Sequence, residues 1–385
     1  MSLIVDEHRE LLSDQNRLDA FRRAIEELVK PGSVVVDLGA GSGIMGLLAC
    51  RAGASRVYSI EETAMIELTR EICRANGFED RVTFIKDFSM HAHLPELADM
   101  VITDQIGQFG FGAGLFEYFR DAHARFLKPG GVLIPSRIDL LVAPVQQEDL
   151  WRQVEFWNQS PASFRFQPAR KLAVNTGYPV KLQPQHLLAS PAVLASLDTG
   201  RCPTSISGVE ASLEVENAGT LHGIGGWFSA QLSPHVTMTN GPLGPNPIKR
   251  QNVFFPIERP VAVEKGDRVK VTMTIQPYET MVTWTVEVSG PQAIGGARNA
   301  ITARFTHSTF QGMLLCQEDL RKTHPHFIPK LSPRGLARRS ILDLCDGQRT
   351  LSEIEQEVYR RHPQLFPSLD QAAAFVAEVI TRYSL

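Results

Sequence analysis

Apolar and polar positions alternate in two regular patterns over the first third of the chain. Residues 13–32 place apolar side chains three and four positions apart, begin with a Ser-Asp pair and end in Pro-Gly, which predicts a helix. The next run, residues 34–38, is short, apolar and rich in valine, which is typical of a buried strand. A further helix is predicted at 63–77, and further strands are predicted at 56–61, 82–87, 99–104 and 130–135. This alternation predicts a doubly wound α/β domain, in which a parallel sheet has helices on both faces.

The pattern changes twice further along the chain. From Arg137 to Ala303 the sequence consists of short β-rich runs broken by Gly and Pro, which predicts a β-barrel or a sandwich. Helical spacing returns near the end, in three segments at 335–347, 350–363 and 368–383. We therefore expect three domains, over residues 1–136, 137–305 and 306–385.

Composition narrows the class of protein. The chain has 385 residues, a formal net charge of −3 and 43% hydrophobic residues, as expected for a soluble globular protein. No apolar run approaches the ~20 residues of a membrane span and no signal peptide is evident, so we expect a cytoplasmic protein without a membrane partner. The near-neutral charge balance disfavours nucleic-acid binding by charge alone.

Neither a disulfide nor a metal site is indicated. The five cysteines are scattered and form no CxxC pair, which favours reduced thiols. His91 and His93 could form a metal-binding pair, but no cysteine or carboxylate cluster lies near them in the sequence. We therefore expect a loop at these histidines and no metal ion.

The segment VVVDLGAGSGIMG, residues 34–46, contains the GxGxxG turn of nucleotide-binding folds, and Glu61 follows about twenty residues later. This spacing fits a dinucleotide or S-adenosylmethionine. Asp37 distinguishes between these two cofactors. The repulsion between its carboxylate and a pyrophosphate charge ~4 Å away would cost ~4 kcal/mol at an effective dielectric of 20, which disfavours a dinucleotide. S-adenosylmethionine lacks phosphate and carries an ammonium group that Asp37 can attract, while Glu61 accepts the ribose hydroxyls. We therefore expect S-adenosylmethionine as cofactor, with contacts from the following residues: Asp37, Gly39, Gly41, Gly43 and Glu61.

The longer segment VVVDLGAGSGIMGLLACRAGASRVYSIE resembles the cofactor half of the protein arginine methyltransferases, a family of class I S-adenosylmethionine-dependent enzymes. LLSDQNRLDAFRRAI is similar to the cofactor-covering helix of that family, which implies that Arg17 binds the methionine carboxylate. FLKPGGVLIPSR resembles the last Rossmann strand, and GGWFSAQL and QNVFFPIERPVAVEKGD resemble barrel strands. The resemblance implies a Rossmann-like methyltransferase domain and a β-barrel domain. VEFWNQSPASF resembles a dimerisation arm, so we expect an arm at about 151–190 and a homodimer.

The segments that hold the substrate in this family are altered here. In TDQIGQFGFGAGLFEYF, Asp104 stands at the position of the first of two substrate-binding glutamates and Ala113 at that of the second. Glu117, one helical turn later, is a candidate replacement, so Asp104 and Glu117 are the predicted catalytic residues. The family's Thr-His-Trp loop is replaced by Pro247-Ile248-Lys249. One acidic partner suits an amine, amide, hydroxyl or carboxylate acceptor at least as well as a guanidinium.

Asp87 and Phe88 follow the third predicted strand, where the adenine edge of the cofactor is expected. Phe88 is expected to stack near the adenine or to pack beneath it. Asp87 either accepts a hydrogen bond from the adenine amino group or ends the strand, and the sequence leaves both roles open.

The C-terminal segment resembles the small winged-helix PqqD-like domains that bind leader peptides, through a helix ending in LCDG and a second helix with SEIEQEV. Such domains add an extended peptide to an exposed strand edge, which FQGMLLC would supply here. A helical cap with a purely structural role is the alternative.

The favoured function of the whole chain is methylation of a peptide or protein by S-adenosylmethionine. The alternatives are a small-molecule methyltransferase and a non-catalytic S-adenosylmethionine-binding module.

Overall fold

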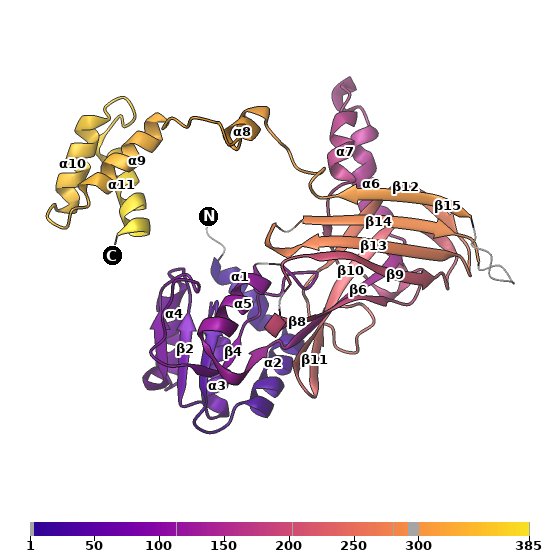
Figure 1. The fold of residues 1–385 in the computed structure, drawn as a ribbon, viewed down its shortest axis with the longest axis horizontal. Coiled ribbons are helices and arrows are strands. Elements are labelled where there is room, and N and C mark those ends of the chain that lie inside the picture. The colour runs from indigo at the N-terminus through magenta and orange to yellow at the C-terminus, as the bar shows by residue number, and fades with distance from the viewer. Residues whose placement is uncertain (1–3, 113, 202, 280, 292–299, 385) are drawn as a thin grey trace. The chain divides into compact units, whose positions relative to one another are not determined.

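The computed structural model describes residues 4–112, 114–201, 203–279, 281–291 and 300–384 (Figure 1). Ala113 and Cys202, on which the sequence raised expectations, lie outside these residues. The chain divides into two compact units, Met1–Met313 and Leu314–Leu385, which are described separately below. No helix in the described ranges combines the length and the apolar character that crossing a membrane requires.

The first unit begins with a five-stranded parallel sheet in the order β3-β2-β1-β4-β5. Its strands are β1 (Val34–Leu38), β2 (Arg56–Ile60), β3 (Val82–Ile85), β4 (Ala98–Ile102) and β5 (Leu127–Ile134). All five residues of β1 are buried, which explains its continuous apolar run. The predicted parallel sheet is confirmed. Because its strands are parallel, the loops after β1, β2, β3 and β4 meet at one edge, where the ligands of such folds bind.

Five helices accompany this sheet. They are α1 (Ile4–Ser13), α2 (Gln15–Leu28), α3 (Ile44–Ala52), α4 (Met65–Ala75) and α5 (Leu115–Arg125). The Asp14 side chain accepts a hydrogen bond from the backbone nitrogen of Arg17 and so caps the start of α2. The apolar face of α2 buries Phe21 and Ile25, as the helical spacing predicts.

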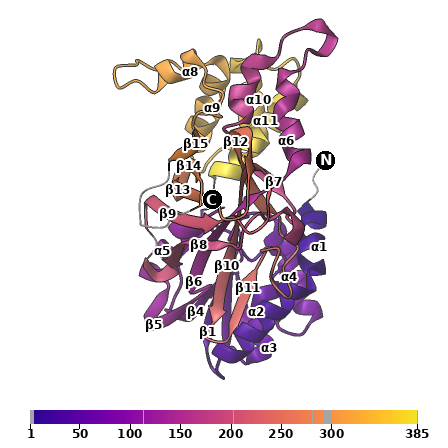
Figure 2. The same ribbon diagram turned by 90° about the vertical axis from the view of Figure 1, so that its right-hand side faces the viewer.

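Two antiparallel sheets follow (Figure 2). The larger consists of β7 (Tyr178–Val180), β12 (Asn252–Val263), β10 (Gly219–Ser233), β6 (Arg137–Val145) and β8 (Ala192–Asp198), with β11 (Val236–Thr239) paired to β10. The smaller consists of β15 (Ile301–Ser308), β14 (Met281–Ser289), β13 (Arg268–Gln276) and β9 (Ile206–Glu214). Trp284 on β14 donates a hydrogen bond to the backbone oxygen of Pro256 on β12 at 2.9 Å, which joins the two sheets. The predicted β-rich region is therefore confirmed, and α2 packs against its β10 and β11 strands.

An arm made of α6 (Glu148–Glu155) and α7 (Arg170–Ala173) lies next to β12 (Figures 1 and 2). Its small core consists of Trp151, Val154, Ala173 and Val174. The guanidinium of Arg170 pairs with Glu155 on α6 at 2.9 Å and with Glu258 on β12 at 2.5 Å. These ion pairs fix the arm to the barrel region.

The first unit also contains single 3₁₀ turns, at Glu79–Arg81, Phe156–Asn158, Pro161–Ser163, Gln167–Ala169, Pro184–His186, Thr199–Arg201 and Pro277–Glu279.

The regular elements among the described residues of the second unit are all helices. They are α8 (Gln317–Lys322), α9 (Pro333–Leu344), α10 (Leu351–Arg361) and α11 (Leu369–Tyr383). A separate apolar core joins α9, α10 and α11, with Ile341, Val358 and Val376 at its centre. The side chains of Ser332, Thr350 and Ser368 cap the three helices. The caps of α10 and α11 match the expected starts at 350 and 368, whereas α9 begins two residues before the expected 335.

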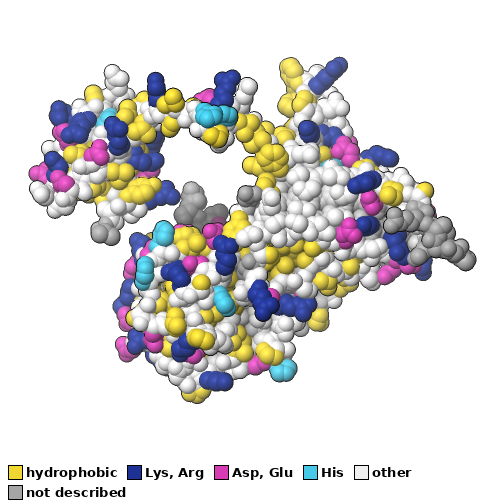
Figure 3. Space-filling model, viewed as in Figure 1, with side chains coloured by type: hydrophobic (Ala, Val, Ile, Leu, Met, Phe, Trp, Pro, Cys, Tyr) yellow, Lys and Arg dark blue, Asp and Glu magenta, His cyan; other side chains and the backbone are white. Residues whose placement is uncertain are grey.

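The expected strand at residues 310–316 is wrong, because this segment forms turns and irregular chain. Its side chains also do not alternate between a buried and an exposed face as a half-buried strand requires. Apolar side chains are instead exposed along and after it (Figure 3). They include Phe310, Met313, Leu314, Leu315, Leu320, Phe327, Ile328 and Leu331.

Candidate functional site

The turn after β1 brings backbone close to side chains from two other segments. Gly39 and Gly41 both have positive φ angles, +69° and +52°. A Cβ atom on Gly39 would overlap the amide group of Gln105, and one on Gly41 would overlap the imidazole of His8. Gly43, with φ +76°, ends the turn and begins α3. The positive φ angles therefore favour glycine at these positions, and a Cβ atom at Gly39 or Gly41 would in addition require the Gln105 or His8 side chain to move.

Two cavities meet at this turn. The first, here called the cofactor cavity, has a volume of about 220 Å³ and is lined by residues that include His8, Arg17, Asp37, Glu61, Asp104 and Arg250. The second, the ring cavity, is lined by residues that include Glu62, Asp87, Phe88, Ser89 and Tyr118. Gly39, Glu61 and Gln105 line both cavities, so the two form one continuous site at the carboxyl ends of β1, β2 and β4.

Asp37 is buried and lines the cofactor cavity. Its Oδ2 accepts a hydrogen bond from the backbone nitrogen of Gly46 at 2.9 Å. Burial raises the pKa of Asp37 to about 7, and the nearby charge of Glu61 adds to this effect, while the Gly46 amide and Arg17 act against it. Because the Gly46 amide and Arg17 only partly offset the lost hydration of this carboxylate, a cation bound beside it would stabilise its charged form.

Glu61 follows β2 and faces the glycine turn. Its Oε2 accepts a hydrogen bond from the Gly41 nitrogen at 3.1 Å, and its Oε1 accepts from the nitrogen and the hydroxyl of Thr63 at 2.9 and 2.7 Å. These contacts orient the carboxylate at the junction of the two cavities. Its Oε2 has a second lone pair that can accept a further hydroxyl hydrogen bond.

The ring cavity has an aromatic wall. The Phe88 ring lies edge-on to Tyr118 with 5.8 Å between the ring centres. The Asp87 Oδ1 accepts a hydrogen bond from the Phe88 nitrogen at 2.7 Å, so this carboxylate shapes the turn after β3. Tyr118 on α5 was not predicted from the sequence, because 30 positions separate it from Phe88 and no local pattern connects the two residues.

Arg17 reaches the cofactor cavity from α2, and its side chain is only 5% exposed. Its Nε pairs with Asp104 Oδ2 at 2.5 Å, and its Nη1 donates to the backbone oxygen of Leu11 at 3.1 Å. Asp104 follows β4 by two residues. The structure therefore brings the predicted cofactor-binding arginine and the first predicted catalytic residue into direct contact.

A second arginine, Arg250, also reaches this site and was not predicted from the sequence. Its Nη2 lies 3.0 Å from the same Asp104 Oδ2 that contacts Arg17, and 3.4 Å from the Asp104 backbone oxygen. The only sequence signal was a long cationic side chain directly before the predicted strand segment QNVFFPI, next to Lys249. Asp104 is thus held by two guanidinium groups.

Glu117, the other predicted catalytic residue, is placed differently. It lies half-buried in the first turn of α5. Neither the cofactor cavity nor the ring cavity has it among its lining residues. The structure does not bring Glu117 to the cavity that holds Asp104.

A third cavity adjoins the first and is here called the acceptor cavity. It is lined by residues that include Glu7, Glu10, Asp14, Gln108 and Lys249, and it shares Leu11, Arg17 and Arg250 with the cofactor cavity. Asp14 is fully engaged, since Oδ1 caps α2 and Oδ2 accepts a hydrogen bond from the Lys249 nitrogen at 2.6 Å.

The donor set fits S-adenosylmethionine. A buried carboxylate suits its ammonium group, a guanidinium suits its carboxylate, a carboxylate at the β2 end suits the ribose hydroxyls, and an aromatic wall suits the adenine. The described residues contain no group of three or more His, Cys, Asp or Glu side chains that would hold a metal ion.

Comparisons with known proteins agree with this assignment. Residues 22–140 match the family described as ribosomal protein L11 methyltransferase, and residues 136–285 match the arginine methyltransferase oligomerization subdomain. Protein arginine N-methyltransferase 6 of Xenopus laevis is 26% identical over 71% of this chain and 84% of its own length. Protein arginine N-methyltransferase PRMT10 of Oryza sativa subsp. japonica is 29% identical over 69% of this chain and 80% of its own length.

Solved structures show the same fold. Arabidopsis thaliana protein arginine methyltransferase 10 superimposes with a TM-score of 0.66 at 22% identity, over 78% of this chain and 97% of that one. The Trypanosoma brucei PRMT1 enzyme-prozyme heterotetrameric complex with AdoHcy gives 0.67 at 20% identity, over the same shares of both chains. The first unit is therefore a Rossmann-like methyltransferase domain followed by a β-barrel domain.

Proposed function

We propose that this chain, an S-adenosylmethionine-dependent methyltransferase of the protein arginine methyltransferase type, methylates a peptide or protein bound in the acceptor cavity. The observation that carries this proposal is the shared wall of two cavities. Leu11, Arg17 and Arg250 line both the cofactor cavity and the acceptor cavity. A side chain that enters the acceptor cavity therefore comes next to the methyl donor.

Each part of the cofactor has a partner in this proposal. Arg17 binds the methionine carboxylate and Asp37 the ammonium group, while Glu61 accepts the ribose hydroxyls. Phe88 and Asp87 face the adenine. Because Gly39, Gly41 and Gly43 have no side chains, the cofactor can approach the backbone of this turn closely. When bound, S-adenosylmethionine supplies a methyl group on a positively charged sulfur.

Asp104 acts as the positioning residue of the acceptor side. Its carboxylate holds Arg17 toward the cofactor and Arg250 toward the acceptor cavity, so one anion aligns both cations. Rigid placement of reacting groups is a large part of catalysis. Glu117 has no part in this proposal, because it lines neither cavity.

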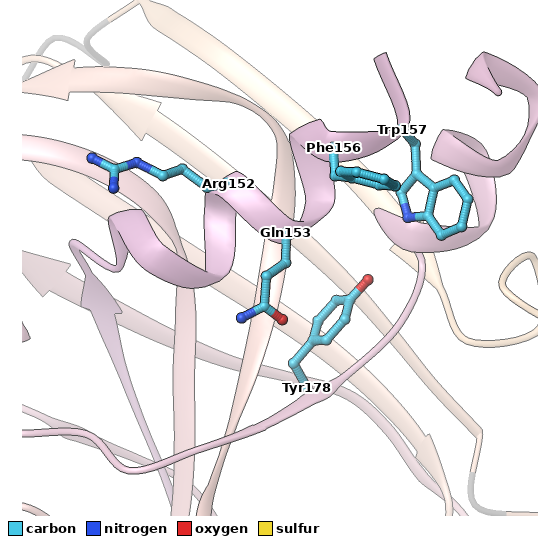
Figure 4. A pocket seen from close by; sticks show the side chains of 5 residues that line it. All are labelled: Arg152, Gln153, Phe156, Trp157 and Tyr178. Carbon is cyan, nitrogen blue, oxygen red and sulfur yellow. The ribbon is translucent and has the colours of Figure 1, made fainter. Parts of the chain in front are cut away.

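A homodimer is the proposed assembly. The match to an oligomerization subdomain supports it, and so does the arm, which carries Phe156 at 43% and Phe164 at 70% exposure. Arg152, Gln153, Phe156, Trp157 and Tyr178 line a hollow on the arm (Figure 4). Exposed aromatic side chains around a hollow are typical of a protein interface.

We also propose that the protein is cytoplasmic. The free thiols of Cys50, Cys73, Cys316 and Cys345 support this location.

The second unit is proposed to tether the peptide acceptor, as PqqD-like domains do. Its independent core and the exposed apolar side chains of Leu314 and Ile328, 87% and 82% exposed, support a binding role. The tether raises the local concentration of acceptor at the first unit. Because the described residues of this unit contain no strand, helices rather than a strand edge would supply the contacts.

The proposal is tested with the full chain, S-adenosylmethionine labelled in its methyl group and two acceptor preparations. One is a peptide library, and the other is a cell extract filtered to remove peptides and proteins. We expect label in the peptides, and removal of residues 314–385 should raise KM for a peptide far more than it lowers kcat. Label only in the filtered extract would support a small-molecule acceptor and overturn the proposal.

A further inference from the structure

Two irregular loops form one side of the acceptor cavity. The first acceptor loop, residues 103–112, follows β4 and contributes Gln108 to the lining. The second acceptor loop, residues 240–251, joins β11 to β12 and contributes Arg250 and Gln251 among others. The shape of the cavity therefore depends on how these two loops are held against each other.

The side chain of Asn240, at the start of the second acceptor loop, is hydrogen-bonded to both loops. Its Nδ2 donates to the backbone oxygens of Gln108 at 2.9 Å and of Gln251 at 2.8 Å. Its Oδ1 accepts a hydrogen bond from the backbone nitrogen of Phe228 on β10 at 3.0 Å. Asn240 is 4% exposed, so water competes little for these bonds. Both amide hydrogens thus hold the two loops together, while the oxygen anchors them to the barrel.

A second asparagine holds Asn240 in place. Asn252, the first residue of β12, is 2% exposed. Its Nδ2 donates to the backbone oxygen of Asn240 at 2.6 Å, and its Oδ1 accepts from the backbone nitrogen of Leu182 at 3.0 Å. Because an amide group left unpaired at this depth is costly, the network favours one arrangement of the two loops.

Gln108 and Gln251 connect Asn240 to charged groups at the wall of the cavity. Gln251 directly follows Arg250, and Gln108 lies four residues after Asp104. Arg250 Nη2 and Asp104 Oδ2 lie 3.0 Å apart, so one acceptor loop supplies each partner of this ion pair. Asn240 itself is not among the described residues that line the acceptor cavity, and it acts on this pair through the backbone.

Resting on the proposed function, we propose that Asn240 is a positioning residue for the methyl acceptor. It aligns the two acceptor loops, and with them Asp104 and Arg250, so that the acceptor side chain meets the methyl donor in one orientation. The described residues that line the cofactor cavity include neither Gln108 nor Gln251. Loss of the Asn240 amide therefore reduces turnover of the acceptor and leaves cofactor affinity unchanged.

The experiment uses the full chain and two variants of Asn240. Asn240→Asp keeps the size of the side chain and the oxygen that accepts from Phe228, but it turns an oxygen toward the carbonyl groups of Gln108 and Gln251. Asn240→Ser is neutral and too short to reach both carbonyl groups. The serine variant keeps the test valid where the aspartate variant does not fold.

Ser233→Ala is the matched control for the loss of a buried hydrogen bond of the barrel. Ser233 is 2% exposed, and its hydroxyl donates to Glu27 on α2 at 2.6 Å. It is not among the described residues that line the cofactor cavity or the acceptor cavity. Turnover by this variant should stay within ~2-fold of the wild type.

Kinetics, cofactor binding and hydrogen exchange are measured for each variant. For an arginine-containing peptide that the wild type labels, kcat/KM should fall at least ~10-fold in both Asn240 variants. The Kd of S-adenosylhomocysteine, measured by calorimetry, should stay within ~3-fold of the wild type. Hydrogen exchange, followed by mass spectrometry, should be at least ~10-fold faster in both acceptor loops and unchanged in the glycine turn at residues 39–43.

Unchanged kcat/KM in a folded Asn240 variant would overturn the inference. A Kd that rises as much as kcat/KM falls would also overturn it, because that result indicates a general loss of the fold. A wild type that labels no peptide, with S-adenosylhomocysteine binding intact, overturns the proposed function instead. Hydrogen exchange then decides the inference alone, since unchanged exchange in both acceptor loops would show that Asn240 does not hold them.

Discussion

Asp37 Oδ2 lies 2.9 Å from the backbone nitrogen of Gly46, which donates a hydrogen bond to it at the start of α3. This contact does not offset the loss of water, so burial raises the pKa of Asp37 from 3.8 to about 7. The carboxyl group that is proposed to bind the cofactor ammonium therefore titrates near neutral pH.

Cofactor affinity should depend on pH for this reason. Only ionised Asp37 attracts an ammonium group, so S-adenosylhomocysteine should bind more tightly as the pH rises and reach a plateau above about 7. Below that value Kd should rise by up to ~10-fold per pH unit. Asp37→Asn should bind weakly at every pH, without this slope. Calorimetry between pH 5.5 and 8.5 makes the comparison, and a pH-independent wild-type Kd would contradict the assigned role of Asp37.

Stability of the unliganded protein should change in the opposite direction. Between 3.8 and about 7 the folded state holds a proton on Asp37 that the unfolded state has lost. The free energy of unfolding contributed by this group therefore falls as the pH rises through that window, and Asp37→Asn should remove that contribution. Urea unfolding at pH 5.5 and 7.5 measures the change in the free energy of unfolding between the two pH values. This change should be larger for the wild type than for Asp37→Asn.

Replacing Glu61 should weaken cofactor binding without unfolding the protein. Glu61→Ala removes the charged acceptor proposed for the ribose, which is expected to raise the Kd of S-adenosylhomocysteine by ~10- to 100-fold. Glu67→Ala, at an exposed position of α4, is the control with unchanged Kd. Tight binding of NAD by the wild type would show that the cofactor is misassigned.

Asp104→Asn should lower both stability and turnover. The neutral amide leaves Arg17 and Arg250 without a counter-charge, and loss of one partner of such a buried pair costs ~3 kcal/mol. Turnover should fall by ~100-fold or more, because both guanidinium groups lose their alignment. Thermal unfolding and initial rates measure the two effects. Asp19→Asn, exposed on α2, should change neither, and a fully stable Asp104→Asn would refute the ion-pair argument.

The arm should hold two copies of the chain together. Light scattering of the wild type should give a dimer, and the double variant Phe156→Asp and Phe164→Asp should give a monomer, since it places charge on the exposed aromatic surface. Leu68→Asp, at an exposed position of α4, serves as the control. A monomeric wild type that still binds S-adenosylhomocysteine would remove the proposed assembly.

The cofactor half of the site could be predicted from the sequence because its parts are local. The glycines, Asp37 and Glu61 belong to one strand-turn-helix-strand segment, residues 34–61, and regular periodicity fixes where each strand ends. Burial of the apolar faces then leaves few ways to arrange that segment. The helical C-terminal unit was predicted for the same reason, since each helix has its own cap and apolar face.

The tertiary structure alone decided the partners of Asp104. From the sequence this residue was the single free acid of the altered loop, whereas in the fold it is paired with Arg17 and Arg250. Arg250 lies 146 positions away, and no local pattern connects the two. Ion pairing depends on distance through space, and that distance is set where the barrel strands pack against α2 and the parallel sheet. The sequence determined what kind of cofactor binds, but the packing of the two domains determined which charges face the acceptor.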